Sequence, residues 1–545
     1  MFFDAEVSRR RFLRIVAGAT GAGLMMPLAR PSDIVAAPAR VSQAVINLGE
    51  PDTLLSGASR SALAGFIYNF IGNGLVRFRH PDMDVVADLA ESWTVSPDAK
   101  TYTFTLRRGV RWQDGEPFTA QDVKFTFELW AHPEWPGPLA ANIATIQGAQ
   151  AYKEKQATEI SGVKILAGQR VQITLIEASA VFLAALALAI MLPRHLLKDV
   201  PPADAQKHPF ARKPVYTGPF MVDSWRTGEG LTFNAFPNYF RGRPRIEGIV
   251  GRNIPDPAAA QAELRAGGVQ LGTTDPDHYD SFARDAAFKT QTLAGGGGWF
   301  LQFDLTNPLF SDRRVRQAIS HAIDRKTIID TVFRGKAEAN FSIPSPLSWL
   351  FNPKISRFDF NVDRAKALLD EAGWKVGSDG IRGRDGRRLD FSLNCTARTR
   401  DWAVSLQPFL KSVGINMKVD VVEFGTWIQR LRVGVHEASF GGWFNFIIDP
   451  RADLQAHFLS PRPVDASGYR NDRVDRLFKQ ARTATDRTQE KRIYDEIQEV
   501  TARDAVYVYL WRPQDLLVAR NTLVIPEVKT QSELYQSAPR WELRA

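Results

Sequence analysis

Some segments of this chain repeat apolar residues at the spacing of a strand, and others at the spacing of a helix. This mixture constrains the fold more than any other sequence feature. A segment at residues 100–110 places Tyr102, Phe104 and Leu106 on one face, as in a half-buried strand. Apolar side chains recur at helical spacing in residues 312–325 and 361–374. Thr119, with Asp122 three residues later, has the pattern of a capping box, which predicts a further helix from Ala120 to about Trp130. Strands and helices follow one another without a strict repeat, which predicts an α/β protein.

The length of 545 residues adds a second constraint. Single hydrophobic cores stop growing at roughly 250–300 residues, so we expect several lobes. Gly295, Gly296, Gly297 and Gly298 precede a strand-like segment at residues 299–305. Four consecutive glycines can absorb large backbone rotations, which favours a hinge. A mobile surface loop is the alternative that composition alone leaves open.

The N-terminus has the order of an export signal. A basic segment at residues 8–14 is followed by an apolar run at residues 15–28 and by small residues around Pro38. The apolar run is too short to span a bilayer. The arginine pair at its start indicates the twin-arginine route. We therefore predict that residues 1–39 are removed and that the product is soluble in the periplasm.

The chain has few sequence motifs that indicate catalysis. The chain has no nucleophile elbow and no Walker loop, and its one cysteine, Cys395, excludes a cysteine-rich metal site. The acidic stretch at residues 275–280 lacks the pattern of a calcium loop, and we interpret it as a solvated turn. The net charge of +9 is spread without a block of like charges, which argues against nucleic acid. We predict no catalytic residue, no metal and no cofactor.

One class of enzyme stays open at this stage. Paired carboxylates of a glycoside hydrolase meet only in space, so an exported enzyme of that kind is the alternative to a binding protein.

Five segments, in order, carry a family resemblance. They are residues 89–128 ("LAESWTVSPDAKTYTFTLRRGVRWQDGEPFTAQDVKFTFE"), 216–225 ("YTGPFMVDSW"), 310–325 ("FSDRRVRQAISHAIDR"), 361–374 ("NVDRAKALLDEAGW") and 469–483 ("YRNDRVDRLFKQART"). The chain resembles the extracellular solute-binding proteins of peptide-type ABC transporters (solute-binding family 5), which include dipeptide, oligopeptide, nickel and opine binders. The resemblance covers nearly all of the chain after the signal.

The resemblance implies an α/β, two-lobed clamp of the periplasmic-binding-protein type (type II-like), with an extra subdomain in the first lobe. The implied boundaries are residues 40–85, 213–293 and 506–545 for lobe I, 86–212 for the extra subdomain, and 294–505 for lobe II. On this template the glycines fall where the chain crosses between lobes. The implied function is capture of a peptide-like, opine-like or sugar ligand, and its delivery by a monomer to a permease and ATPase complex in the inner membrane. Sensing without transport is the alternative role for such a binding protein.

The segment "GGWFNFIIDP" at residues 441–450 departs from the family pattern Gly-Trp-x-x-Asp-x-x-Asp-Pro. In peptide binders the first Asp of this pattern holds the ligand's α-amino group; here Phe446 takes its position, directly after Asn445 and three residues after Trp443. An ammonium buried without its carboxylate loses several kcal/mol, and a phenyl ring returns only about 0.5–2 kcal/mol. We expect ligands without a free amine at this spot. A core strand is the alternative interpretation of the segment.

The resemblance also suggests a second edge of the pocket. In dipeptide binders an arginine after the strand at residues 389–394 grips the peptide carboxylate, which makes Arg398 or Arg400 a candidate. Trp299 and Phe300, just past the glycines, are candidates for stacking on the ligand. The alternatives are solvated arginines and aromatic rings that belong to the core.

Overall fold

The computed structural model describes residues 43–59, 61–135, 137, 143–179, 182–295, 297–433, 437–444, 450–460, 467–482, 484 and 486–544. The chain divides into two compact units, Met1–Val41 and Ser42–Ala545, and the described residues all belong to the second. The predicted signal at residues 1–39 therefore lies outside the described residues. Within the described ranges, no helix has both the length and the apolar content needed to cross a membrane.

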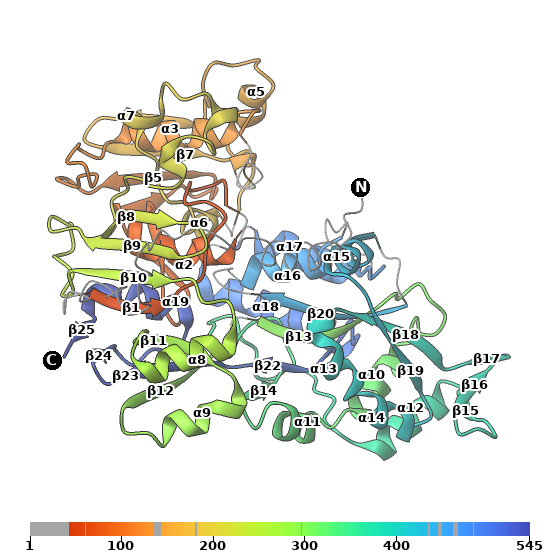
Figure 1. Ribbon diagram of the computed structural model, residues 1–545. Coiled ribbons are helices and arrows are strands. Elements are labelled where there is room, and N and C mark those ends of the chain that lie inside the picture. The colour runs from red at the N-terminus through yellow and green to blue at the C-terminus, as the bar shows by residue number, and fades with distance from the viewer. Residues whose placement is uncertain are drawn as a thin grey trace, which may run out of the picture. The chain divides into compact units, whose positions relative to one another are not determined.

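A seven-stranded sheet collects strands from the beginning, the middle and the end of the chain (Figure 1). In spatial order they are β12 (Phe288–Leu293), β23 (Asp515–Arg520), β11 (Leu271–Thr274), β1 (Gln43–Asn47), β10 (Gly248–Arg252), β9 (Gly230–Ala235) and β8 (Phe220–Arg226). The central strand β1 pairs in parallel with β10 and β11, and the outer pairs are antiparallel. Helix α2 (Ala62–Ile71) packs on β8 and on α19 (Gln531–Gln536), so an early helix and a late helix of the described chain pack together beside this sheet.

A four-stranded sheet follows α2 in sequence. Its order is β4 (Ala90–Val95), β5 (Thr101–Leu106), β7 (Arg170–Thr174) and β6 (Val163–Leu166). The alternation predicted for β5 is confirmed: Tyr102, Phe104 and Leu106 are buried. Helix α3 (Ala120–Ala131) packs on this sheet and begins at a capping box, in which the Asp122 carboxylate accepts from the backbone N–H of Thr119 at 2.8 Å.

A five-stranded sheet forms the framework of the second half. Its order is β19 (Asn416–Val421), β18 (Asp390–Cys395), β20 (Ala438–Phe444), β13 (Gly297–Phe303) and β21 (Tyr507–Tyr509). Two of the predicted helices appear here as α10 (Arg313–Ala322) and α12 (Val362–Glu371), which pack against each other. Gly373 has a φ of 84°, the left-handed conformation that ends a helix and favours glycine.

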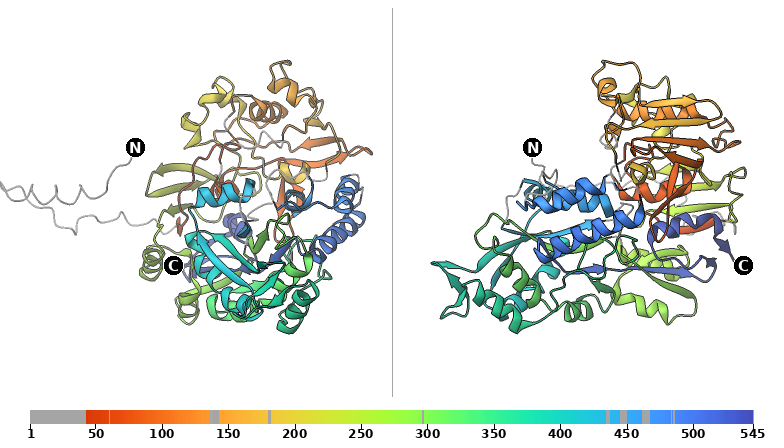
Figure 2. Two further views of the ribbon diagram at one scale, coloured as in Figure 1. Left: turned by 90° about the vertical axis from the view of Figure 1, so that its right-hand side faces the viewer. Right: turned by 180° about the vertical axis from the view of Figure 1, so that it is seen from behind.

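Further helices and short strands complete the second half. They are α11 (Arg325–Val332), α13 (Arg400–Val404), α14 (Gln407–Ser412), α15 (Phe424–Val433), α16 (Pro450–Phe458), α17 (Asp472–Ala481), α18 (Arg487–Arg503), β14 (Ala337–Ala339) and β22 (Trp511–Pro513). Helices α17 and α18 run side by side in every view (Figures 1 and 2). Their buried residues join Phe300 and Tyr507 of the sheet in one hydrophobic cluster.

The chain crosses between the seven-stranded and the five-stranded sheet twice. The first crossing joins β12 to β13 through residues 294–296. The second leaves the five-stranded sheet at β21, passes through β22, which pairs with β14, and reaches β23 after Gln514. A Cβ atom added to Gly295 would lie 1.7 Å from the carbonyl oxygen of Pro513. The two crossings therefore touch, and this contact requires a glycine at position 295.

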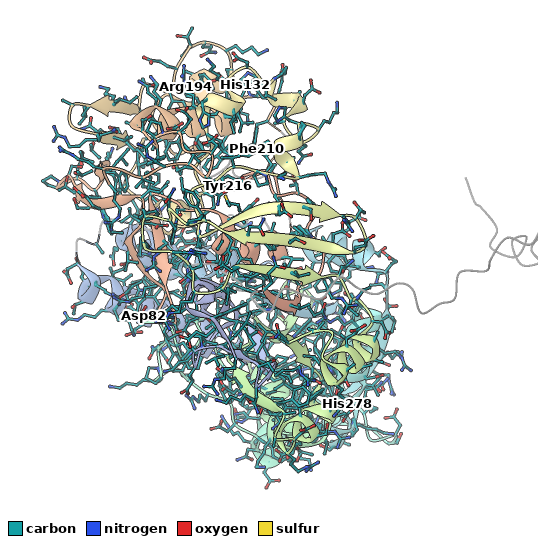
Figure 3. The ribbon with its side chains drawn as sticks, turned by 60° about the vertical axis from the view of Figure 1, so that its left-hand side comes forward. Asp82, His132, Arg194, Phe210, Tyr216 and His278 are labelled. Atoms are coloured by element: carbon teal, nitrogen blue, oxygen red, sulfur yellow. The ribbon has the colours of Figure 1, made fainter. Side chains whose placement is uncertain are left out.

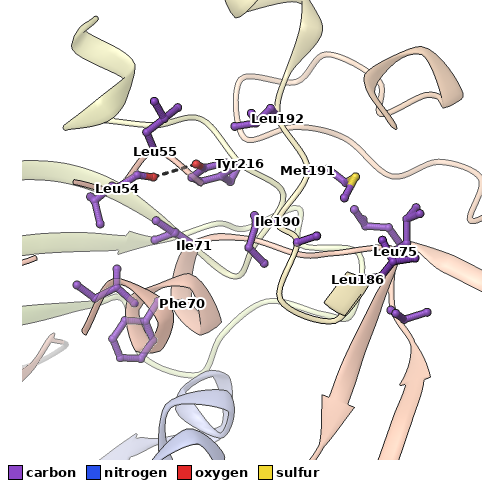
Figure 4. Packing of buried hydrophobic residues seen from close by; sticks show 14 of the residues in the cluster. Leu54, Leu55, Phe70, Ile71, Leu75, Leu186, Ile190, Met191, Leu192 and Tyr216 are labelled. Atoms are coloured by element: carbon purple, nitrogen blue, oxygen red, sulfur yellow. Dashed lines mark hydrogen bonds between the residues drawn. The ribbon is translucent and has the colours of Figure 1, made fainter. Parts of the chain in front are cut away.

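The largest hydrophobic cluster lies around the seven-stranded and four-stranded sheets (Figure 4). Tyr216 is fully buried in it and donates its hydroxyl hydrogen to the carbonyl oxygen of Leu54 at 2.9 Å. The ring of Phe210 meets the Tyr216 ring edge-on at 5.4 Å (Figure 3). These contacts fix the loop after β1 against the segment that precedes β8.

One sequence interpretation is wrong. Residues 275–280 form most of a helix, α9 (Pro276–Ala283), and not a solvated turn. Asp275 is its N-cap, since the Asp275 carboxylate accepts from the backbone N–H of His278 at 3.0 Å, and Pro276 takes the first helical position. The acidic residues favoured a turn in the sequence interpretation, although the first of them, Asp275, is the N-cap of a helix.

Candidate functional site

The segment at residues 441–450 begins as a strand and resumes as a helix. Gly441, Gly442 and Trp443 belong to β20, where the Trp443 backbone pairs with Gly298, and Pro450 opens α16. Residues 445–449 lie outside the described residues, so the candidate positions Asn445 and Phe446 stay predictions. The departure from the family pattern therefore falls between a central strand and a helix start.

Gly441 and Gly442 make room for two aromatic rings on the neighbouring strand. Gly441 pairs with Phe300 and Gly442 with Trp299 across β20 and β13. A Cβ atom at Gly441 would come within 2.5 Å of the Phe300 ring, and one at Gly442 within 2.8 Å of the Trp299 ring. A larger side chain at either position would displace a ring.

Trp299 and Phe300 lie on opposite faces of the five-stranded sheet, because successive strand residues alternate. Trp299 is 7% exposed and packs against Trp402 and Phe440, with ring centroids 5.2 and 5.6 Å away. Phe300 is 1% exposed and packs against Tyr507 at 4.3 Å. The structure does not bring the two rings together on one surface.

Arg398 and Arg400 follow β18 at the sheet edge. Both side chains are exposed, and the Arg400 guanidinium lies 3.1 Å from the Asp401 carboxylate. Neither arginine, and neither Trp299 nor Phe300, lines the two cavities described next.

A large cavity of about 720 Å³ opens beside α2 and α19. Its polar and charged lining residues are Ser59, Ser61, Tyr68, Asn69, Asn73, Arg77, Arg79, His80, Asp88, Tyr239, Arg241, Ser532, Glu533, Gln536 and Arg540. Arginines outnumber carboxylates in this list, so the lining has a positive balance. The volume falls within the range of small-molecule sites, about 300–1,000 Å³.

Asp88 holds together the polar side of the large cavity. Its carboxylate accepts two hydrogen bonds from the Asn73 side-chain amide at 3.1 and 3.2 Å, and it pairs with the Arg241 guanidinium at 2.7 Å. Thr217 in turn donates to the Asn73 side-chain oxygen at 3.2 Å. Burial raises the pKa of Asp88, and the Arg241 charge opposes that rise.

Two groups of the large cavity are incompletely satisfied. The Arg77 guanidinium donates to Gln536 at 3.3 Å, but its Nε has no partner among the described residues. Burial, with repulsion from Arg241, lowers the pKa of Arg77. The Tyr68 hydroxyl also lacks a partner within the described ranges, and its burial raises the pKa of Tyr68 well above the ordinary value. Buried groups of this kind are the ones that a bound polar solute satisfies.

A small cavity of about 70 Å³ adjoins the large one, and His80 and Ser532 line both. Its walls come from both crossings, from the loop before α19, from a loop of the second half and from the start of α16. The residues are Phe66, His80, Pro81, Met83, Ala294, Gly295, Ser345, Leu347, Ser348, Pro450, Arg512, Asp515, Thr530, Gln531 and Ser532. Pro450 places this cavity next to the end of the 441–450 segment.

Ion pairs join the parts of the chain that build the two sheets. Asp84 of β3 (Asp84–Ala87), which pairs with β2 (Val76–Arg79), lies 2.5 Å from Arg487 at the start of α18. Near α9, Asp280 lies 3.4 Å from Lys336.

Sequence reasoning missed Asp88 and Asp515. Asp88 comes directly before the first segment of the resemblance and has no motif of its own. Asp515 had a weak signal, since it is the one charged residue in the run "DLLVA" at residues 515–519. A charge at the edge of a buried strand requires a partner or a function.

Comparison with known sequences identifies relatives over almost the whole chain. The family described as bacterial extracellular solute-binding proteins, family 5 Middle, matches residues 84–463. The oligopeptide-binding protein AppA of Bacillus subtilis is 28% identical over 505 residues, covering 91% of this chain and 90% of AppA.

Solved structures agree with that match. AppA of B. subtilis in complex with a nonapeptide has a TM-score of 0.72 and 27% identity, and covers 92% of this chain and 99% of its own. NikA of Brucella suis in complex with Fe(III)-EDTA has a TM-score of 0.78 at 24% identity, covers 92% and 100% of the two chains, and shares the fold. These similarities confirm the predicted α/β periplasmic-binding-protein fold. The chain belongs to the bacterial extracellular solute-binding proteins of family 5, and is the substrate-binding component of an ABC importer rather than an enzyme.

Proposed function

We propose that this protein captures a small solute between two lobes and presents it to an inner-membrane permease and ATPase complex. Lobe I comprises residues 40–85, 213–293 and the chain after the second crossing at Gln514, with residues 86–212 as its extra subdomain, and lobe II comprises residues 294–513. The expected boundary at residue 506 is corrected, because β21 and β22 pair with β13 and β14 of the second half. The observation that carries the proposal is the small cavity. Its walls come from both lobes and from both crossings, so a solute that enters it contacts both lobes at once.

Movement between the lobes would occur at the two crossings. The first crossing spans residues 294–296, and the second spans Gln514. Of the four glycines expected to form a hinge, Gly295 lies at the first crossing, Gly296 lies outside the described residues, and Gly297 and Gly298 belong to strand β13 and not to the crossing. A solute bound between lobes stabilises the arrangement in which its contacts to both lobes exist together. The ion pair of Asp84 with Arg487 adds a contact of the same kind. The permease then receives a protein whose two lobes are held by the solute.

The solute class that we propose is peptide-like, opine-like or oligosaccharide. The name of AppA supports an oligopeptide, and the Fe(III)-EDTA complex of NikA supports a polycarboxylate of comparable size. The positive balance of the large cavity favours a solute with a carboxylate, which Arg77 can receive. Phe446 argues against a free amine in its usual place. Trp443, Asn445 and one of Arg398 and Arg400 remain proposed contacts.

We also propose that the protein reaches the periplasm by the twin-arginine route. The arginine pair at Arg9 and Arg10 and the short apolar run after it support this route. The protein then works there as a monomer.

Thermal unfolding of residues 40–545 against matched solutes tests the proposal. The panel holds free di- and tripeptides, their N-acetylated forms, opine-like acids and oligosaccharides. A solute at 100 times its dissociation constant adds about 2.7 kcal/mol of stability, which raises the melting temperature by about a degree or more. Stabilisation by one class identifies the solute. If no class stabilises the protein, the proposed solute range is wrong.

A further inference from the structure

Asp515 stands at the point where the second crossing enters the seven-stranded sheet. It is the first residue of β23, and its backbone pairs with Leu293 at the end of β12, where the first crossing leaves. Its side chain is only partly exposed and lines the small cavity, together with Gly295 and Pro450. The carboxylate therefore lies where both crossings and the start of α16 converge.

No described residue donates a hydrogen bond to the Asp515 carboxylate or forms an ion pair with it. The ionisable groups around it are His80, Arg512 and Tyr535. The Arg512 guanidinium donates to the carbonyl oxygen of Ile343 at 3.3 Å, and the charges that act on it are those of Glu338 and Asp453.

The other two neighbours are uncharged at neutral pH. Burial, with repulsion from Arg77, lowers the pKa of His80 to about 4. Burial raises the pKa of Tyr535 to about 12. Neither side chain compensates the charge of Asp515.

An uncompensated carboxylate is costly in a folded protein, and a chain that retains one usually uses it. Burial raises the pKa of Asp515 to about 6, so at neutral pH the group is still mainly ionised. A space of about 10–15 Å³ holds one water molecule, and the small cavity measures about 70 Å³. It therefore accommodates an ammonium group with a few carbon atoms.

We propose that Asp515 binds a cationic group of the solute, a primary ammonium, inside the small cavity. This inference rests on the proposed function and adds a recognition residue to it. The resemblance puts the amine-binding carboxylate of peptide binders at the position of Phe446, four residues before Pro450. Pro450 lines the small cavity, so Asp515 places a negative charge beside the described end of the segment at residues 441–450.

The test uses n-propylammonium as the probe and calorimetric titration of residues 40–545 at pH 7.5. The wild-type protein is expected to bind it with millimolar affinity, and Asp515→Asn to weaken that affinity at least tenfold. Neutral 1-propanol is expected to show no saturable binding. Asp82→Asn is the matched control: Asp82 lies in the same turn as His80, outside the cavity lining, and its loss removes a nearby charge (Figure 3). It is expected to change the affinity by less than about twofold.

A second measurement needs no variant. Propylammonium stays protonated below pH 7.5, so its affinity for the wild-type protein should fall as Asp515, with its pKa of about 6, takes up a proton, about fivefold between pH 6 and pH 5. The proposal is overturned if wild type and Asp515→Asn bind the probe equally, if Asp82→Asn weakens binding as much, or if the affinity is constant across this range.

The proposed capture of a solute and the proposed cation site at Asp515 can be refuted independently of each other. Propylammonium is not a transported solute, so an absence of binding at Asp515 leaves the capture of a neutral or anionic solute standing. If the probe binds through Asp515 while every solute of the panel fails to stabilise the protein, the cation site holds and the proposed solute range is wrong.

Discussion

Asp88 in the large cavity is 2% exposed and Asp515 in the small cavity is partly exposed, and burial raises the pKa of each. Asp88 is compensated by the Arg241 guanidinium and the Asn73 amide, whereas Asp515 has no such partner among the described residues. The same side chain therefore serves two purposes in neighbouring cavities. Asp88 organises a wall, and Asp515 leaves a charge available to a solute.

The largest change in stability is expected from Asp88→Asn, which removes the carboxylate that has partners. Asp88→Asn leaves the Arg241 charge without its partner and should destabilise the protein by about 2–3 kcal/mol. This is below the full cost of breaking a buried pair, because the Arg241 side chain is 30% exposed. Urea denaturation at pH 7.5 measures the change. A variant as stable as the wild type would show that the Asp88 network is dispensable.

In the absence of solute, Asp515→Asn is expected to stabilise the protein, whereas Asp88→Asn destabilises it. The folded-state pKa of about 6 lies above the unfolded value of about 3.9, so the bound proton stabilises the folded protein below about pH 4. That contribution is lost as the pH rises to about 6, and the wild-type protein then carries an unpaired charge. The asparagine variant should be more stable by about 1–2 kcal/mol at pH 7.5.

This gain should disappear near pH 4, where the wild-type carboxyl is protonated. Parallel urea denaturation of both proteins at pH 7.5 and pH 4 measures it. If Asp515→Asn is instead less stable than the wild type at pH 7.5, the Asp515 carboxylate has a structural partner. Asp515 and Asp88 would then not differ in whether their charge is compensated.

The smallest effect is expected at Tyr68, whose buried hydroxyl has no partner within the described ranges. Tyr68→Phe removes no hydrogen bond, so the stability without solute should change by no more than about 0.5 kcal/mol. If a solute bonds to this hydroxyl, its affinity should fall by about two- to tenfold. Titration of the stabilising solute into both proteins measures this. Unchanged affinity would remove Tyr68 from the site.

The regular elements were predictable because their patterns are local. The alternation of Tyr102, Phe104 and Leu106 and the capping box at Thr119 and Asp122 need no distant partner to form. Helix α9 was missed for the reverse reason. Its Asp-Pro start resembles a turn until the following residues adopt helical geometry.

The candidate site could be predicted only in part. The glycines at 441 and 442 and the rings at Trp299 and Phe300 each stand out in sequence, but their pairing depends on the register of β13 with β20. Whether a buried carboxylate is compensated depends on residues such as Asn73 and Arg241, which are far apart in the chain. No local pattern separates Asp88 from Asp515.

The position of β13 determines how the second half of the protein unfolds. The strand is hydrogen-bonded on both sides, to β20 and to β21, and its residues alternate between two hydrophobic clusters, Trp299 and Leu301 in one and Phe300 in the other. Neither cluster can open without exposing the strand that it shares with its neighbour. The five-stranded sheet and the helices on both of its faces should therefore unfold as one cooperative unit. Local opening is then expected at the crossings between the seven-stranded and the five-stranded sheet.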